Sequence, residues 1–162
     1  MPRDGVYPIK MQIGDHVPDF TATDQTGASM KLSDLLAGGP LVLFFYPKAF
    51  TPGCTQESCH FRDMYGEIKA AGGHAAGVSA DSVEQQAKFA GTYAFPFPLL
   101  SDADHGIARL FGIKRPGFLP AKRSTFVIDE SSTVQGIIAS ELHMDTHADE
   151  AIAILRKLHT AQ

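Results

Sequence analysis

Apolar residues in this chain alternate between unbroken runs typical of strands and spaced positions typical of helices. The run at 41–46, Leu-Val-Leu-Phe-Phe-Tyr, lies between Pro40 and Pro47 and has the pattern of a strand buried on both faces. After it, apolar side chains recur at steps of three and four residues, at Phe61, Met64, Tyr65 and Ile68. This spacing predicts one helix from 54 to about 71, ended by Gly72-Gly73, directly after a central strand.

The rest of the chain continues the same alternation. Two short segments, 20–23 and 29–32, flank the turn-rich quartet 24–27 and predict a hairpin, followed by one helical turn at 33–36. Helices are predicted at 82–93, opened by an Asp81-Ser82 cap, and at 148–158. The remaining predicted strands are 75–79, 98–100, 124–128 and 134–139, the last two joined by the turn 129–132.

This order of elements predicts an α/β fold: a central mixed β-sheet flanked by helices on both faces, with an N-terminal β-hairpin. No repeat or long linker divides the 162 residues, so one domain is expected over 1–162, with a segment at about 1–12 that can be loose. In such sheets, reactive groups gather at the carboxyl ends of central strands. The segment 47–54 follows the buried strand and is therefore the expected site. Phe44, Phe45, Phe61 and Phe111 are expected in the core.

Composition and charge limit the kinds of molecule that this protein is expected to bind. The chain is 44% hydrophobic and 20% charged, as in an ordinary globular domain, and its net charge of -4 argues against nucleic acid or an anionic membrane. Residues 1–10 lack the apolar stretch of a secretory signal. The run at 41–46 is about a quarter of the length that spans a bilayer. We expect a cytoplasmic protein with no nucleic-acid or membrane partner.

The two cysteines, Cys54 and Cys59, are only five positions apart, which favours a local chemical device over a structural disulfide framework. Pro52 suits the first turn of a helix, where its missing N–H has no partner to lose. Cys54 is therefore expected in that turn, where free backbone N–H groups and the helix dipole favour a thiolate. Thr51 can add a hydroxyl and Gly53 a close backbone approach, giving a polar cradle in which a peroxide can be aligned.

The spacing of the cysteines carries a second expectation. In an ideal helix, positions five apart have Cα atoms roughly 8.6 Å apart, beyond the ~7 Å limit for a disulfide. If Cys59 resolves a sulfenic acid on Cys54, the first turns of the helix must therefore unwind during each cycle.

The motif Pro47-x-x-x-Thr51-x-x-Cys54 resembles the active-site motif of the peroxiredoxins, and the stretch 45–59 is similar to the PrxQ or bacterioferritin comigratory protein subgroup. The similarity extends to 14–20, 97–102 and 123–129. It implies a thioredoxin-like fold and a thiol peroxidase that reduces hydrogen peroxide and organic hydroperoxides in antioxidant defence. No cofactor or metal is expected.

The resemblance also implies roles for individual residues. Cys54 matches the peroxidatic cysteine, and Thr51 and Pro47 match its motif partners. Arg123 matches the arginine that polarises the peroxide and holds the thiolate, and Glu57 an acidic residue that orders the polar network.

Cys59 lies where one branch of the PrxQ group keeps its resolving cysteine. The implied cycle closes an intramolecular disulfide that thioredoxin or a similar dithiol reduces. A monomer is expected, with a weak dimer left open.

Simpler interpretations remain for each residue. Either cysteine can be a packed thiol, and Arg123 a surface charge. Glu57 can be a first-turn acid that suits the helix dipole, and Thr51 can merely shape the loop.

Two other classes of function compete with a peroxidase. A thioredoxin-like disulfide reductase normally has two residues between its cysteines, whereas four intervene here. A metal-binding or structural module would use Cys54, Cys59 and His60, or His143 with His147 at a four-residue step. No second Cys/His pair has the spacing of a zinc finger, which counts against this class.

Overall fold

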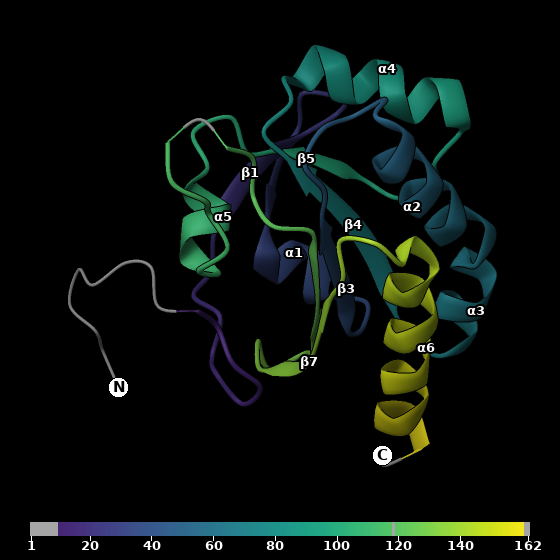
Figure 1. The fold of residues 1–162 in the computed structure, drawn as a ribbon. Coiled ribbons are helices and arrows are strands. Elements are labelled where there is room, and N and C mark those ends of the chain that lie inside the picture. The colour runs from purple at the N-terminus through teal and green to yellow at the C-terminus, as the bar shows by residue number, and fades with distance from the viewer. Residues whose placement is uncertain (1–9, 118, 161–162) are drawn as a thin grey trace.

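The computed structural model describes residues 10–117 and 119–160, and Figure 1 shows their arrangement around one twisted sheet. In chain order the elements are β1 (Thr21–Asp24), β2 (Ser29–Lys31), α1 (Leu32–Leu36), β3 (Leu41–Phe45), α2 (Pro52–Asp63), α3 (Tyr65–Ala70), β4 (His74–Ser79), α4 (Val83–Tyr93), β5 (Leu99–Ser101), α5 (Gly106–Leu110), β6 (Ser124–Ile128), β7 (Val134–Ala139) and α6 (Met144–Thr160).

The seven strands form one sheet in the order β2-β1-β5-β4-β3-β6-β7. The crossovers through α2, α3 and α4 make β3, β4 and β5 parallel neighbours, whereas the hairpins β1–β2 and β6–β7 are antiparallel. β6 also runs antiparallel to β3, with Ser124 opposite Phe45. The sheet is therefore mixed, and β3 lies inside it with its carboxyl end next to the start of β6.

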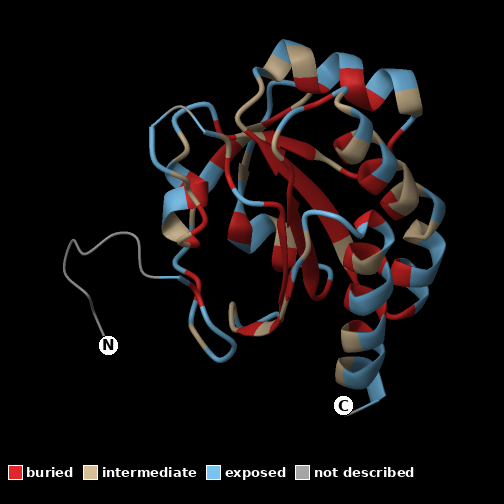
Figure 2. Cartoon of the chain, in the orientation of Figure 1, coloured by how far each residue is buried: buried red, intermediate tan, exposed pale blue. Residues whose placement is uncertain are grey.

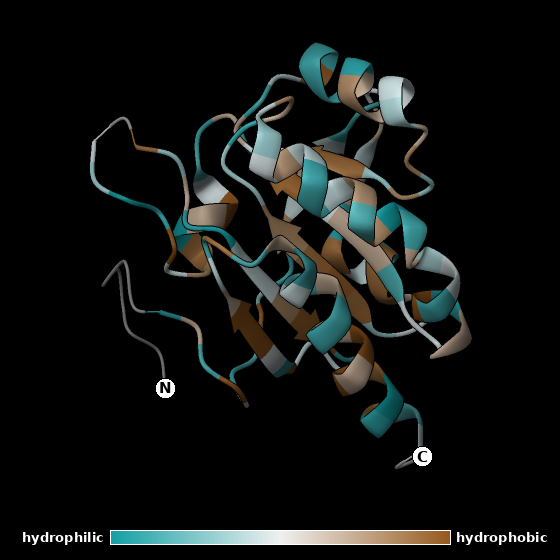
Figure 3. Cartoon of the chain, turned by 45° about the vertical axis from the view of Figure 1, so that its right-hand side comes forward, coloured by the Kyte–Doolittle hydropathy of each residue, from teal (hydrophilic) through white to brown (hydrophobic). Residues whose placement is uncertain are grey.

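Alternation along β3 divides the core in two. Val42 and Phe44 of the strand, with Tyr46 just after it, pack under α2, α3, α4 and α6. The odd-numbered side chains from Leu41 to Phe45 pack against α1 and α5. Figure 2 shows the strands buried while the outer surfaces of the helices are exposed, and Figure 3 shows the matching change from apolar strands to hydrophilic outer helix faces. The predicted α/β fold class, with helices on both faces and an N-terminal hairpin, is confirmed.

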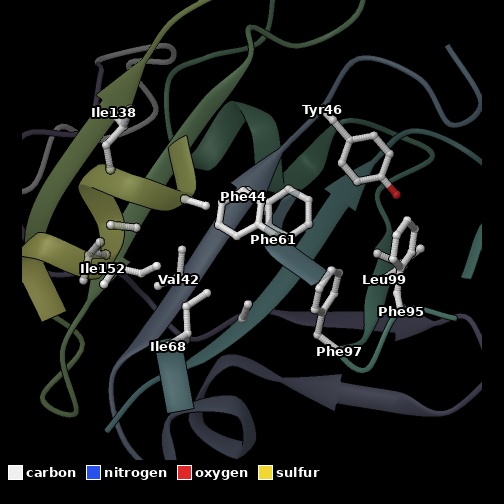
Figure 4. Packing of buried hydrophobic residues seen from close by; sticks show 14 of the residues in the cluster. Val42, Phe44, Tyr46, Phe61, Ile68, Phe95, Phe97, Leu99, Ile138 and Ile152 are labelled. Atoms are coloured by element: carbon white, nitrogen blue, oxygen red, sulfur yellow. The ribbon is translucent and has the colours of Figure 1, made fainter. Parts of the chain in front are cut away.

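An aromatic stack fixes α2 to the sheet. The rings of Phe44 and Phe61 lie 4.1 Å apart at 13° to each other, and Phe97 meets Phe44 edge-on at 5.5 Å (Figure 4). Both stacked rings are fully buried. Phe61, one of the regularly spaced apolar residues that predicted this helix, is therefore the side chain that anchors it to the sheet.

Two predicted helices need correction, and one helix was not predicted. The predicted helix 54–71 is two helices divided at Met64, whose backbone (φ -95°, ψ 4°) leaves the helical region; Gly66 in the next turn has weak helix propensity. The last helix starts at Met144, four residues before the predicted start. α5 was not predicted, because five residues are too few to show a period; the Asp102 carboxylate caps it by accepting the N–H groups of Ile107 and Ala108, both at 2.9 Å.

Other expectations concern the ends of the chain and the membrane. Of the predicted loose segment 1–12, residues 1–9 lie outside the described residues, and Met11 donates its backbone N–H to the carbonyl of Phe111 at 3.1 Å. Within the described ranges, no helix is long and apolar enough to cross a bilayer.

Truncation of the Phe61 ring tests the anchoring of α2. Phe61→Ala removes a fully buried ring and should lower the free energy of unfolding by about 3–5 kcal/mol, measured by urea denaturation. Leu142→Ala is the control, because Leu142 is 84% exposed and its loss should change stability by less than about 0.5 kcal/mol. Equal effects of the two substitutions would contradict the assigned role of Phe61.

Candidate active site

The loop that follows β3 places the predicted site. The backbone N–H of Ala49 donates to Asp81 Oδ2 at 2.7 Å, and the same oxygen accepts the hydroxyl of Ser79 at 2.6 Å. Ser79 ends β4, the parallel neighbour of β3. The loop is therefore tied to the end of the adjacent strand before the chain enters α2.

Cys54 is the third residue of α2, and its side chain is fully buried. Two donors point at its sulfur: the backbone N–H of Lys48 at 3.5 Å and Nη2 of Arg123 at 3.4 Å. The charge of the guanidinium, the backbone donor and the amino-terminal end of the helix all favour a negatively charged sulfur.

Pairing between β3 and β6 brings Arg123 to the sulfur. The residue directly precedes β6, at the end where Ser124 lies opposite Phe45, and its side chain is only 7% exposed. Besides the contact with Cys54, its Nη1 donates to Glu57 Oε1 at 2.7 Å. Burial alone would lower the pKa of Arg123, but the charges of Glu57 and Cys54 outweigh burial and raise it.

Glu57 follows Cys54 by three residues and lies on the same face of α2. It is fully buried. Burial raises the pKa of its carboxyl to about 8, although the neighbouring Arg123 acts in the opposite direction. The guanidinium of Arg123 thus interacts with both Cys54 and Glu57, and it is the positive charge that the two groups share.

The structure brings Cys54, Arg123 and Glu57 together, as the sequence predicted. The remaining candidates have different surroundings. Thr51 precedes α2 as its N-cap residue, but its hydroxyl donates to the carbonyl of Lys48 at 2.7 Å and makes no capping bond. Pro47 begins the loop and is half-buried.

Cys59 lies on α2 within the same regular helix as Cys54, and both thiols are free. Its side chain is partly buried against the core beneath the helix. This burial raises the pKa of the Cys59 thiol, with a smaller opposing effect from Arg62.

His147, which the sequence suggested only as a metal ligand with His143, is a buried polar residue behind Arg123. His147 of α6 is fully buried, with Nδ1 2.8 Å from Thr125 Oγ1 and Nε2 2.8 Å from the carbonyl oxygen of Ser140. A signal was present, because residue 147 falls on the buried stripe of α6 that includes Met144, Ala148, Ala151, Ile152 and Leu155.

The histidines proposed as metal ligands have different surroundings. His143 is exposed and precedes α6, whereas His147 is buried within the helix. His60 Nε2 lies 2.8 Å from Asp149 Oδ1. In the part of the chain that the structure describes, no three His, Cys, Asp or Glu side chains gather in a group that could hold a metal ion.

Comparison with known proteins gives consistent matches. The model of the AhpC/TSA family matches residues 13–137. Chloroplastic peroxiredoxin Q from Sedum lineare is 38% identical over 151 residues, which cover 92% of this chain and 80% of that protein.

Solved structures agree in fold. The crystal structure of peroxidoxin BcpB from Mycobacterium tuberculosis has 51% identity and a TM-score of 0.89, covering 91% of this chain and 98% of that one. The bacterioferritin comigratory protein of Xanthomonas campestris has 31% identity and a TM-score of 0.80, covering 86% and 92%. The thioredoxin-like fold implied by the sequence is thus confirmed.

Gly53 offers a test of the Arg123 contact. A Cβ at this position would lie 3.2 Å from Arg123 Nη2, so Gly53→Ala should displace the guanidinium from the sulfur. We expect oxidation of Cys54 by hydrogen peroxide to slow by about tenfold, measured by stopped flow. Unfolding free energy should fall by no more than about 1 kcal/mol, because alanine favours a helix.

Gly66→Ala is the matched control. Gly66 is also helical, but an added Cβ there meets nothing within 4 Å. This substitution should leave the rate of Cys54 oxidation unchanged. Equal rates in the two alanine variants would show that Arg123 does not depend on the space left by Gly53.

Proposed function

This chain belongs to the AhpC/TSA family and is a peroxiredoxin, a thiol peroxidase; on that premise we propose that Cys54 attacks the peroxide and that Cys59 resolves the product. The observation that carries the proposal is the buried sulfur of Cys54 at the start of α2, within hydrogen-bonding distance of Lys48 N and Arg123 Nη2. Such donors stabilise a thiolate and the charge that develops as the O–O bond breaks.

The first step is a two-electron transfer. The Cys54 thiolate attacks one peroxide oxygen, an S–O bond forms and the O–O bond breaks. The leaving oxygen takes a proton and departs as water or an alcohol, while the sulfur becomes a sulfenic acid. Arg123 is in position to polarise the peroxide, and Glu57 holds the guanidinium from its other side.

The second step joins the two cysteines. The thiol of Cys59 attacks the sulfenic sulfur, water leaves and a disulfide forms. Because α2 is a continuous helix over Pro52–Asp63, the Cα atoms of the pair lie roughly 8.6 Å apart, too far for that bond. The segment between them must unwind first, and this supports a cycle coupled to local unfolding.

Pro47 and Thr51 have a smaller part in this proposal. Pro47 sets the course of the loop after β3, and Thr51 closes it through its bond to Lys48. Both thereby position the backbone N–H that faces the sulfur.

The substrates we propose are hydrogen peroxide and organic hydroperoxides, and the proposed reductant is thioredoxin or a similar dithiol. The Xanthomonas campestris relative has alkyl peroxide reduction activity, which supports the organic class. We further propose a single domain over 1–162 that acts as a monomer in the cytoplasm, where dithiol reductants are available.

Intact mass tests the cycle. One equivalent of hydrogen peroxide added to the reduced protein should lower its mass by about two hydrogen atoms, as a disulfide forms. Cys54→Ser should show no change, because the attacking thiolate is absent. Cys59→Ser should gain about one oxygen and lose turnover with thioredoxin, because the sulfenic acid has no internal partner.

Two results would contradict the assignment of Cys59. One is a Cys59→Ser variant that turns over at the parental rate with thioredoxin. The other is a parent protein that gains oxygen without losing hydrogen. Consumption of peroxide by Cys54→Ser at the parental rate would contradict the assignment of Cys54.

A further inference from the structure

Two buried titratable side chains meet behind Arg123. Glu57 and His147 are both fully buried, and Glu57 Oε2 lies 3.5 Å from His147 Nδ1. Among the described residues, this oxygen has no hydrogen-bond partner. A buried, ionised carboxylate oxygen that accepts no hydrogen bond is unfavourable. We therefore expect a proton between Oε2 and Nδ1.

The other ring nitrogen of His147 fixes where that proton can be. Nε2 lies 2.8 Å from the carbonyl oxygen of Ser140, which can only accept, so Nε2 carries a hydrogen. Nδ1 is therefore the nitrogen whose protonation can change. It also lies 2.8 Å from the hydroxyl of Thr125, which can donate or accept and so suits either state of the ring.

The geometry favours one proton for the pair. With none, the lone pairs of Oε2 and Nδ1 would face each other beside a full negative charge; with two, both atoms would present hydrogens. One proton gives either a carboxyl with a neutral imidazole or a carboxylate with an imidazolium. Both arrangements are neutral as a unit. Burial raises the pKa of Glu57 and lowers that of His147, which favours the first arrangement.

Several charged groups act on this pair from the surrounding elements. Arg123, ahead of β6, contacts Glu57 directly, and Cys54 lies on the same helix as Glu57. Weaker charges come from Glu141, in the loop before α6, and from Glu150 on α6. The direct contact of Arg123 makes its guanidinium the group most affected by the charge of the pair.

We propose that Glu57 and His147 share one proton at neutral pH. Because this proton keeps the pair neutral, the positive charge of Arg123 remains available to stabilise a thiolate at Cys54. Without the proton, the Glu57 carboxylate at 2.7 Å from Nη1 would neutralise the guanidinium, and a thiolate at 3.4 Å from Nη2 would be an uncompensated buried charge. His147 touches neither the sulfur nor the peroxide and is a positioning residue. The inference rests on the proposed function, since it takes Cys54 as the reacting thiol.

A double-mutant cycle tests this proposal in protein that carries Cys59→Ser, so that only Cys54 contributes thiolate absorbance. His147→Gln keeps a donor for the Ser140 carbonyl but removes Nδ1. The Glu57 carboxyl then loses the acceptor of its proton, which favours the carboxylate, so we expect the midpoint of the ultraviolet thiolate titration to move upward by about one pH unit. In a Glu57→Gln background, no carboxylate remains to be neutralised, and the same substitution should move the midpoint by less than about a third of a unit.

The outcomes separate the possible roles of His147. A purely structural role would give equal shifts in both backgrounds, and an idle histidine would give none; either result overturns the proposal. If circular dichroism shows that His147→Gln does not fold, His147→Leu replaces it in the same cycle, because it also removes Nδ1 and adds no polar group beside Glu57. Failure of Cys54 in the otherwise unaltered protein to react with peroxide would instead overturn the proposed function.

Discussion

The guanidinium of Arg123 is the buried positive charge on which the arrangement of the site depends. A charge this far from solvent must be paired, and it has two partners: the Cys54 sulfur on Nη2 and the Glu57 carboxyl on Nη1. Both partners come from α2, whereas Arg123 directly precedes β6. The contact exists because β3 leads into α2 and pairs with β6. The register between these two strands therefore determines where Arg123 lies relative to Cys54.

The helix that carries both cysteines has to meet two opposing demands. Its first turn must be ordered for Cys54 to face Arg123, yet the proposed disulfide requires the segment from Cys54 to Cys59 to unwind. Beyond that segment, Phe61 stacks on Phe44 in the core, and Arg62 Nη1 donates to the carbonyl of Tyr93 on α4 at 2.9 Å. These contacts hold the carboxyl half of the helix, so opening can be confined to its first turns at less than the cost of global unfolding.

Local pattern predicted much of the fold but less of the site. The run at 41–46 and the turn at 129–132 identified their strands because the signals lie within a few residues. The kink at Met64 and the short α5 gave no periodic signal. Cys54 was expected from its position after Pro52, whereas the role of Arg123 came only from family resemblance. The contacts of Asp81 with the loop and of His147 with Glu57 join distant elements, which no local period encodes.

The identity of residue 147 illustrates how such a residue can be recognised. It lies on the apolar stripe of α6, where a leucine would pack without desolvating a polar ring. An imidazole at this position needs compensating partners on each nitrogen, and the structure provides them in Ser140, Thr125 and Glu57. Because these partners come from α2, β6 and the loop after β7, the imidazole links the C-terminal helix to the network around the sulfur. A buried polar side chain on an otherwise apolar helix face thus indicates a charged or polar group nearby with which it interacts.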